Sequence, residues 1–166
     1  MRGRDEDDYR DYVAGRLTGW RRTAYLLCHD WHLADDLVSI TAGKLYRHWN
    51  RVRRVERLDA YVGRMLVNAW QDELRRSSRR DVLAEVDDRL PAPPGPDVPE
   101  RLSQLELLRR LPPRQRAAVV LRFYEDLSVQ DTAAALGCTE GTVKSLSSRG
   151  LQSLRGYAGQ TTEETP

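Results

Sequence analysis

The sequence predicts an all-α chain made of two small helical domains. Apolar side chains recur at intervals of three and four residues through most of the 166 residues, and no strand pattern of useful length occurs. Five of the eight prolines fall within residues 91–99, where fixed φ angles and missing backbone donors exclude a continuous helix. Two helical units joined by a proline-rich linker account for this pattern.

The first domain is expected to span residues 1–80 and to contain three or four helices. The spacing of apolar residues predicts helical segments over 8–28, 34–49 and 58–80, with a connector at 30–32 and an arginine-rich loop at 50–57. In the last of these helices, Val62, Leu66 and Ala69 should face inward. Its outer face should carry polar side chains, namely Arg64, Asn68, Gln71, Asp72, Arg75 and Arg79.

Residues 81–99 are expected to form an acidic linker. It could lie in a basic channel as a mimic of nucleic acid, or it could serve only to keep the chain soluble, and the sequence leaves both readings open. The second domain, residues 100–157, should hold a helix at 99–110, another at 114–124 with Pro113 at its first turn, and a helix-turn-helix. A short polar tail, 158–166, is expected to be disordered.

The helix-turn-helix occupies residues 128–155 and is predicted with its caps. Ser128 is suited to cap the first helix, because its hydroxyl can accept from the free amides of the first turn. Gly137 supplies the left-handed residue that ends this helix. Thr139 should cap the second helix, where the charge of Glu140 favours the positive end of the helix dipole.

The second helix of this motif has two different faces. Val143, Leu151 and Leu154 share the side expected to be buried, while the outer side carries small, polar and cationic residues: Gly141, Thr142, Lys144, Ser145 and Ser148. Such a face suits insertion into the major groove of DNA. The alternative is an ordinary helical hairpin packed in a core, which would not account for the outer face.

Positive charge is concentrated in two segments, although the net charge of the chain is only +2. Residues 47–80 hold ten basic and four acidic side chains, and residues 101–157 hold nine and five. Residues 81–100, between them, hold one basic and six acidic side chains. Two basic segments attract a polyanion and predict binding that weakens with salt. Solvation of charged faces explains the charge but not its arrangement in two blocks.

Several classes of protein are disfavoured. Cys28 and Cys138 stand far apart and show no disulfide or Cys-x-x-Cys pattern, which is typical of a reduced, cytoplasmic protein. No apolar run reaches the length of a membrane span, and no phosphate-cradling glycine loop is present. We therefore expect no membrane association, no cofactor and no enzyme activity.

One cluster mixes residues that could bind a metal: Cys28, His29, Asp30, His32, Asp35 and Asp36. His32 and Asp36 lie four residues apart and could meet on one helix. The carboxylates also stand at an expected helix start, where they favour the helix dipole without any metal. The second interpretation is preferred.

Four runs of residues resemble a known family. They are Ala-Asp-Asp-Leu-Val at 34–38, Ala-Tyr-Val-Gly-Arg-Met-Leu-Val-Asn at 60–68, Leu-Pro-Pro-Arg-Gln-Arg at 111–116 with the segment 121–128, and Leu-Gly-Cys at 136–138 with 141–145. In this order they resemble regions 2 and 4 of the extracytoplasmic-function (ECF) sigma factors, small sigma-70-type subunits of bacterial RNA polymerase. The residues in these runs are most similar to those of an actinobacterial subgroup of the family.

The resemblance implies an alternative sigma factor that binds core RNA polymerase and directs initiation at promoters. The helix 34–49 would bind the β′ clamp helices of the polymerase, through Asp35, Asp36, Leu37, Lys44 and Arg47. Helices within 101–124 would engage the β flap. An anti-sigma factor is a common partner in the family, and its presence here stays open.

The resemblance also implies two DNA sites. The −10 element would be recognised and opened by Arg53, Arg54, Tyr61, Arg64, Asn68, Asp72, Arg75, Arg76 and Arg79. The −35 element would be read by Thr142, Lys144, Ser145, Ser148 and Arg149. The alternative function is a stand-alone helix-turn-helix regulator, which usually dimerises on half-sites and needs no polymerase to bind its operator.

Two apolar residues on these faces have more than one interpretation. Trp70 lies beside the expected −10 row and could stack on a base or pack in the core. Leu146 lies at the edge of the recognition helix and could touch a thymine methyl group or an anti-sigma protein, or pack locally. Gly150 stands where the family usually has Ala, which should weaken the end of this helix.

Overall fold

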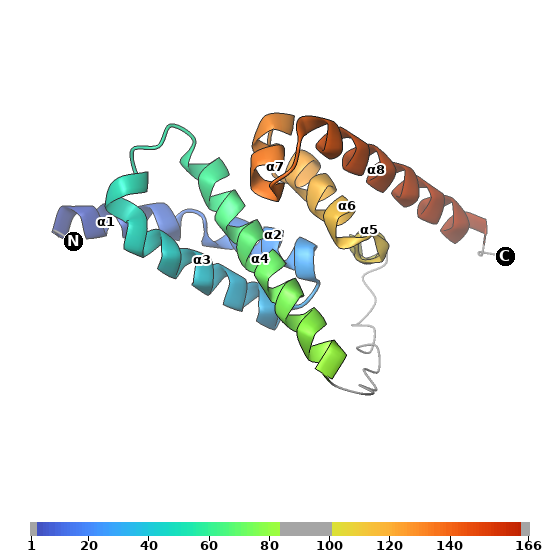
Figure 1. Ribbon diagram of the computed structural model, residues 1–166, viewed down its shortest axis with the longest axis horizontal. Coiled ribbons are helices and arrows are strands. Elements are labelled where there is room, and N and C mark those ends of the chain that lie inside the picture. Colours follow the sequence, from blue (N-terminus) through green and yellow to red (C-terminus); the bar gives the residue numbers. More distant parts are fainter. Residues whose placement is uncertain (1–2, 84–100, 164–166) are drawn as a thin grey trace.

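The computed structural model describes residues 3–83 and 101–163, and all regular structure within these ranges is helical. The first half of the molecule consists of α1 (Gly3–Ala14), α2 (Leu17–Cys28), α3 (Trp31–Val52) and α4 (Leu58–Leu83). The second half consists of α5 (Arg101–Arg110), α6 (Pro113–Val119), the π-helical turn η1 (Val120–Tyr124), α7 (Val129–Leu136) and α8 (Glu140–Glu163). The all-α prediction is confirmed, and the two ends of the chain lie at opposite ends of the molecule (Figure 1).

The segment expected as one helix over 8–28 is two helices. The break falls at Gly15 and Arg16, where the amide of Arg16 bonds to the carbonyl of Val13 at 2.9 Å in a tighter turn than an α-helix has. Arg16 has a φ of −124°, outside helical values. Glycine lowers the cost of leaving the helix at this point, and the regular apolar spacing on both sides concealed the break.

Helix α3 is longer at both ends than the sequence indicated. Asp30, expected in a connector, is its N-cap, and its carboxylate accepts from the amides of His32 at 2.8 Å and Leu33 at 3.2 Å. At the other end the helix continues to Val52, which is buried, so the arginine-rich loop is only residues 53–57.

The caps of the helix-turn-helix are confirmed. The amide of Asp131 donates to the hydroxyl of Ser128 at 3.0 Å, and Gly137 ends α7 with a φ of +64°. The amide of Thr142 donates to the hydroxyl of Thr139 at 3.2 Å. Pro113 begins α6, as expected.

Between α6 and the helix-turn-helix, the chain passes through η1. The amide of Glu125 bonds to the carbonyl of Val120, five residues earlier, at 3.1 Å. This spacing defines a π-helical turn, which holds more residues in each turn than an α-helix does.

The tail is the main error in the predicted boundaries. Residues 158–163 were expected to be disordered, but they continue α8 to Glu163. Tyr157 packs against the core, and the Arg110 guanidinium lies 5.7 Å from the centre of its ring, which anchors α8 at this residue. Residues 81–83 likewise belong to α4, while the rest of the expected linker, 84–99, and residues 164–166 lie outside the described residues.

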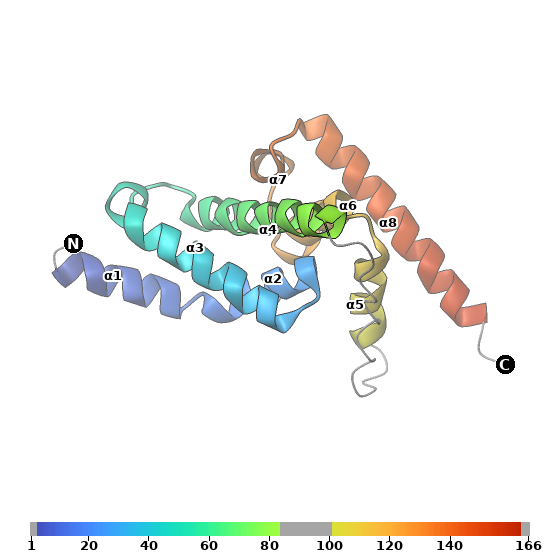
Figure 2. The same cartoon turned by 60° about the horizontal axis from the view of Figure 1, so that its bottom comes forward.

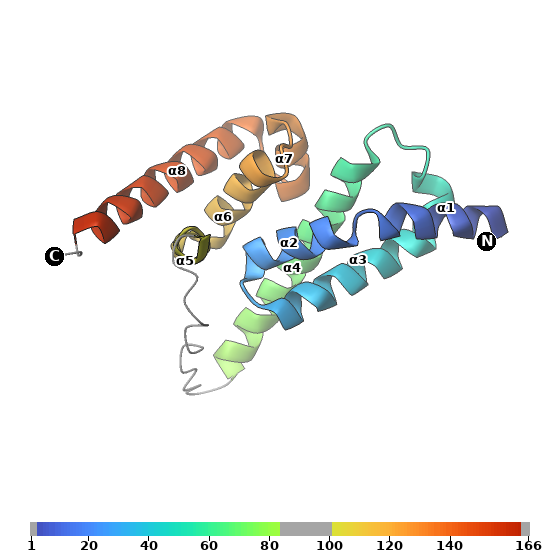
Figure 3. The ribbon, with the colours of Figure 1, turned by 180° about the vertical axis from the view of Figure 1, so that it is seen from behind.

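The two halves share one hydrophobic core. Leu27 of α2 and Trp70 of α4 belong to the same buried cluster as Leu108 of α5 and Leu121 of η1. Helix α4 lies between the other helices of the first half and those of the second half, and α7 packs along it (Figures 2 and 3). Burial of apolar surface therefore holds the halves together as well as each half by itself.

Arg116 of α6 connects the halves by hydrogen bonds. Its guanidinium donates to the carbonyl oxygen of Leu27, at the end of α2, at 2.6 Å. It also donates to the carbonyls of Leu108, Arg109 and Leu111 at 3.1, 3.1 and 3.0 Å. These carbonyls lie at or just after the ends of α2 and α5, where the regular helical partners run out; that of Leu108 also accepts from the amide of Leu111 at 3.1 Å.

Burial also shifts the pKa values of groups beside this contact. It lowers the pKa of Arg116 itself, which remains a cation. Burial and the charges of Arg116 and Arg109 lower the pKa of His29 to about 4, so this imidazole is neutral near pH 7.

Two smaller contacts also join the halves: the Thr23 hydroxyl donates to the Glu125 carboxylate, and Arg57 pairs with Asp131.

Candidate nucleic-acid interface

The outward face of α8 carries most of the residues expected to read DNA. Lys144, Ser145, Ser148 and Arg149 are all exposed and occupy neighbouring turns of the helix. Thr142 is half-buried, and its hydroxyl lies 2.9 Å from the hydroxyl of Thr139, so it takes part in the cap. Four of the five predicted side chains are therefore free to meet a partner.

Close packing on α6 fixes the orientation of this face. Val143 is fully buried, and Gly150 lies so near α6 that a Cβ atom there would come within 2.7 Å of Val119 Cγ2. Gly150 therefore does more than weaken the helix end, because its lack of a side chain permits the close crossing. Leu146 is half-buried against the core, which favours the local-packing interpretation of this residue.

A second exposed row follows α4. Arg64, Asn68, Arg75 and Arg79 are exposed at spacings of four, seven and four residues, which places them on one side of the helix. Asp72 lies in the same row and forms an ion pair with Arg75. The row is therefore cationic, with one amide and one carboxylate among its arginines.

Three other predicted residues of α4 take different positions. Arg76 is exposed on the next strip of the helix surface. Tyr61 is half-buried and packs against the core, so only part of its ring is available. Trp70 is only 2% exposed, which makes it a core residue and excludes base stacking in this conformation.

The loop between α3 and α4 is partly neutralised by carboxylates from other elements. Arg53 is half-buried and pairs with Asp5 and Asp8 of α1. Arg57 contacts both carboxylate oxygens of Asp131, at 2.8 and 2.9 Å. Arg54, in the same loop, is exposed. No local pattern indicates the Arg57 contact, because its partner lies 74 residues further along the chain.

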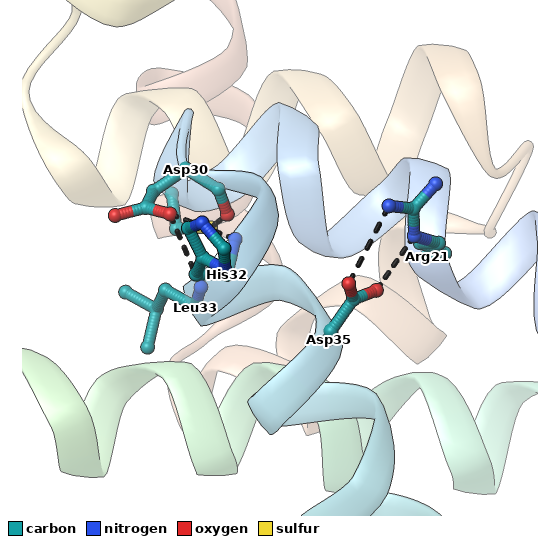
Figure 4. Close-up of polar contacts among 6 residues, drawn as sticks. Arg21, Asp30, His32, Leu33 and Asp35 are labelled. Carbon is teal, nitrogen blue, oxygen red and sulfur yellow. Dashed lines mark hydrogen bonds and ion pairs between the residues drawn. The ribbon is translucent and has the colours of Figure 1, made fainter.

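The surface of α3 carries the residues expected to bind protein. Asp36 and Arg47 are exposed, and Lys44 is half-buried. Asp35 pairs with Arg21 of α2, with one of its oxygens 2.6 Å from Nε (Figure 4). The hydrogen bond from this arginine lowers the pKa of the Asp35 carboxyl, which is therefore ionised near pH 7.

One of the predicted α3 residues is wrong as a surface contact. Leu37 is 1% exposed and packs in the core, so its side chain cannot touch a partner. Two large apolar residues of α3 that no sequence motif indicates, Ile40 and Tyr46, are each 41% exposed. Exposed large apolar side chains next to charged ones are typical of protein-binding surfaces.

The cluster considered for metal binding does not converge. Asp30 caps α3 and Asp35 pairs with Arg21, so two of its carboxylates already have partners (Figure 4). Among residues 3–83 and 101–163, no three His, Cys, Asp or Glu side chains are placed to hold an ion together. In the same ranges, no helix combines the length and apolar character needed to cross a membrane.

A capped helix-turn-helix together with a separate cationic helix face is typical of a DNA-binding protein. The sequence matches the family model for sigma-70 region 2 over residues 16–80 and that for sigma-70 region 4 over residues 102–154. The chain belongs to the sigma-70 family of RNA polymerase sigma factors, in its ECF group.

Relatives in actinobacteria agree with this assignment. The chain is 34% identical to the RNA polymerase sigma-E factor of Streptomyces coelicolor over 152 residues, which is 89% of this chain and 84% of that protein. It is 36% identical to the ECF RNA polymerase sigma factor SigE of Mycolicibacterium smegmatis, over 87% of this chain and 59% of the relative.

Solved structures have the same fold. The sigma factor RpoE of Bartonella quintana, crystallised with the anti-sigma factor NepR, superposes with a TM-score of 0.76 at 24% identity, covering 92% of this chain and 97% of that one. CnrH, in complex with the cytosolic domain of CnrY, has a TM-score of 0.66 at 19% identity, with 93% and 90% coverage.

Proposed function

We propose that this chain is an alternative sigma factor that carries core RNA polymerase to promoters through two DNA-binding surfaces. The observation that carries the proposal is the pair of exposed cationic faces, one on α4 and one on α8, in a chain that matches both sigma regions. A stand-alone helix-turn-helix regulator would need only the second face. The family membership of residues 16–80 therefore favours the sigma factor.

The −35 element is the target of α8. Lys144 and Arg149 can donate to guanine edges or phosphates, and the small Ser145 and Ser148 let the helix approach the floor of the groove. Thr142 orients the start of this helix through its contact with Thr139 and contacts DNA only at its exposed edge.

The −10 element is the target of α4 and the loop before it. The arginines Arg54, Arg64, Arg75, Arg76 and Arg79 bind phosphates, since the guanidinium fork matches phosphate geometry. Asn68 has the amide that suits a base edge, and Asp72 holds Arg75 in place through their ion pair. Arg53 joins this set once its contacts with α1 are released, and Tyr61 contributes the exposed part of its ring.

Core polymerase binds the exposed side of α3. Asp36, Lys44 and Arg47 contact the β′ clamp helices, with Asp35 held by Arg21 and Leu37 supporting the helix from inside. Helices α5 and α6 engage the β flap. An anti-sigma factor is a second class of partner, because the fold matches that of the sigma factor RpoE, which was solved in complex with the anti-sigma factor NepR.

Tethering both DNA surfaces to one polymerase raises their combined affinity, because the second contact becomes intramolecular. Opening the −10 region requires unstacking of bases, and capture of a flipped base offsets part of that cost. The chain contributes recognition, and the polymerase contributes the catalytic chemistry. It acts in the cytoplasm, where the polymerase and the chromosome are.

Run-off transcription tests the proposal. Cognate core RNA polymerase is incubated with a pool of genomic promoter fragments, with and without the chain, and the transcripts are sequenced. Discrete transcripts that require the chain, and that share upstream elements, would support it. Polymerase-independent binding to a palindromic site, with no effect on transcription, would favour the stand-alone regulator.

Variants then separate the two surfaces. Lys144→Ala should impair initiation at promoters that depend on the −35 element and leave core binding intact, because its side chain is exposed and lies on α8, away from α3. Equal loss of core binding would contradict this assignment.

The double variant Asn68→Ala/Arg75→Ala should reduce formation of the open complex, measured by permanganate reactivity of unpaired thymines. Binding to core polymerase should change much less, because neither side chain lies on α3. Normal melting in this double variant would remove both residues from the −10 site.

A further inference from the structure

Helix α1 places acidic side chains against the loop assigned to the −10 element. It carries five acidic and two basic residues among its twelve, and none of its residues is buried. It runs along α3 (Figure 2), and its N-terminal part lies beside Arg53, the residue that caps the end of α3. Packing in the core therefore does not explain the acidic character of α1.

The contact between Arg53 and α1 is the most shielded ion pair among the described residues. The side chains of Arg53 and Asp5 are 25% and 21% exposed, and in every other pair at least one partner is more exposed than either of these. Asp8, one turn further along α1, adds a second carboxylate oxygen 3.6 Å from the same nitrogen. Since water and salt screen this pair less than a surface pair, the two carboxylates hold the guanidinium firmly.

Separate contacts anchor α1, so its carboxylates stay in place if Arg53 leaves. The hydroxyl of Tyr9 donates to the carbonyl of Ala42 in α3 at 2.8 Å. The hydroxyl of Tyr12 donates to the carboxylate of Asp59 in α4 at 2.7 Å. Neither contact involves Arg53, and the arginine is therefore the part that can move.

Arg53 satisfies its donors only in part while it is held. Its Nε atom is buried and has no hydrogen-bond partner among the described residues, which is unfavourable for a cationic donor. Outside this position, a phosphate would offer two oxygens to the guanidinium fork. Arg54, the next residue, is exposed and has no ion-pair partner within residues 3–83 and 101–163. The loop thus presents one free arginine beside one that is held.

We propose that α1 is an intramolecular competitor of DNA, in which Asp5 and Asp8 hold Arg53 away from the backbone of the −10 strand until other contacts have anchored that strand. The inference rests on the proposed recognition of the −10 element by α4 and its loop, and it adds a regulation of that site. Carboxylates tethered beside Arg53 act at an effective concentration on the order of millimolar, so a loosely bound strand does not displace them. A strand already held by Arg54 and the exposed row of α4 presents its next phosphate at a comparable effective concentration, and can.

The test uses the holoenzyme and the single-stranded, non-template −10 segment of a promoter identified by the transcription experiment. Fluorescence anisotropy of the labelled strand gives its affinity for the wild-type holoenzyme and for Asp5→Asn/Asp8→Asn, which keeps the side-chain size and removes both charges. The matched control, Asp7→Asn/Asp11→Asn, removes two charges from the same helix. Both of its positions are exposed and form no ion pair within the described parts of the chain. Thermal melting verifies the folding of each variant.

We expect Asp5→Asn/Asp8→Asn to bind the strand about fivefold more tightly than wild type, at the upper end of the range for a partly exposed ion pair. The slope of log affinity against log salt concentration should become steeper by about 0.7, because Arg53 then displaces a counterion from the strand. The gain should be the same on a strand with a shuffled −10 sequence, since a phosphate carries no sequence information. The control should stay within about twofold of wild type, because its charges act only through a screened field.

Arg53→Gln links the gain to one side chain. In the wild-type chain it should weaken binding about twofold or less, because the guanidinium is held there, and in Asp5→Asn/Asp8→Asn it should remove most of the gain. Arg54→Gln, which changes the free neighbour, should weaken binding by the same factor in both chains. If the double variant melts far below wild type, Asp8→Asn alone carries the test, because that side chain is 56% exposed, with an expected gain of about twofold.

Three results would overturn the proposal while leaving recognition of the −10 element intact. They are wild-type affinity after loss of the carboxylates that hold Arg53, an equal gain in the control Asp7→Asn/Asp11→Asn, and a gain that survives Arg53→Gln. If the wild-type holoenzyme binds neither the promoter strand nor the shuffled one, the proposed function itself fails, and the inference with it.

Discussion

Arg116→Ala should destabilise the protein and uncouple its two halves. The substitution removes four hydrogen bonds from one guanidinium, three of them to the partly buried carbonyls of Leu27, Leu108 and Leu111. The carbonyl of Leu108 keeps a bond from the amide of Leu111, so at about 1 kcal/mol for each of the two partly buried acceptors left unpaired the loss is about 2 kcal/mol in the free energy of unfolding. This is a large share of the roughly 5–15 kcal/mol that stabilises a typical domain.

Urea unfolding can report each half separately. All four tryptophans, at positions 20, 31, 49 and 70, precede the second half, so their fluorescence follows the first half and the core that it shares with the second. Circular dichroism at the helical band follows both halves. In the wild-type chain the two transitions should coincide, because the core is shared. In Arg116→Ala they should separate, with both midpoints lowered.

Two further variants test whether the hydrogen bonds of Arg116 account for this loss of stability. Arg114→Ala, an exposed position on the same helix, should change the free energy of unfolding by less than about 0.5 kcal/mol. Arg116→Lys keeps the charge but cannot reach four carbonyls with one ammonium group, and should fall between wild type and Arg116→Ala. Coincident transitions within about 0.5 kcal/mol of wild type in Arg116→Ala would refute the reasoning.

Three more predictions concern packing and titration. Gly150→Ala should lower the free energy of unfolding by about 1–2 kcal/mol because of the clash with Val119, and Val119→Ala in the same chain should reverse much of that loss in a thermal melt. The pKa of His29 is lowered to about 4, so the unfolded chain takes up this proton first; stability should fall as pH decreases from about 6.5 towards 4. His29→Asn, which tolerates the φ of +56° there, should reduce this dependence in urea titrations, and an unchanged profile would exclude His29 as its source. Burial raises the pKa of the Cys28 thiol to about 11, so iodoacetamide should modify it at pH 8 about a hundredfold more slowly in folded than in urea-unfolded protein; equal rates would contradict the burial argument.

Local chemistry explains which parts of the fold were predictable. Ser128, Gly137 and Thr139 act on amides and dihedral angles within three residues of themselves, so the sequence alone indicated their roles. The exposed rows on α4 and α8 followed from helical periodicity for the same reason. The inward position of Leu37 shows the limit of a family resemblance, which places a residue on a helix without saying which way it faces.

Long-range contacts explain what the sequence could not indicate. Arg116 and Leu27 are 89 positions apart, and Arg57 and Asp131 are 74 apart. Nothing in the sequence distinguishes Arg116 and Arg57 from the many other arginines of this chain, or Asp131 from its other carboxylates.

The π-helical turn η1 acts as a one-residue spacer between α6 and the helix-turn-helix. Each residue of a helix advances the chain by about 100° of rotation, so loss of one residue within Val120–Tyr124 would turn everything that follows by roughly that angle. Helix α7 would then present a different side to α4, and α8 would aim its arginines away from their present direction. A single-codon deletion in this turn should therefore cost far more than any one substitution within it. The angular setting between the two halves of the molecule is thus encoded in a residue count rather than in the identity of any side chain.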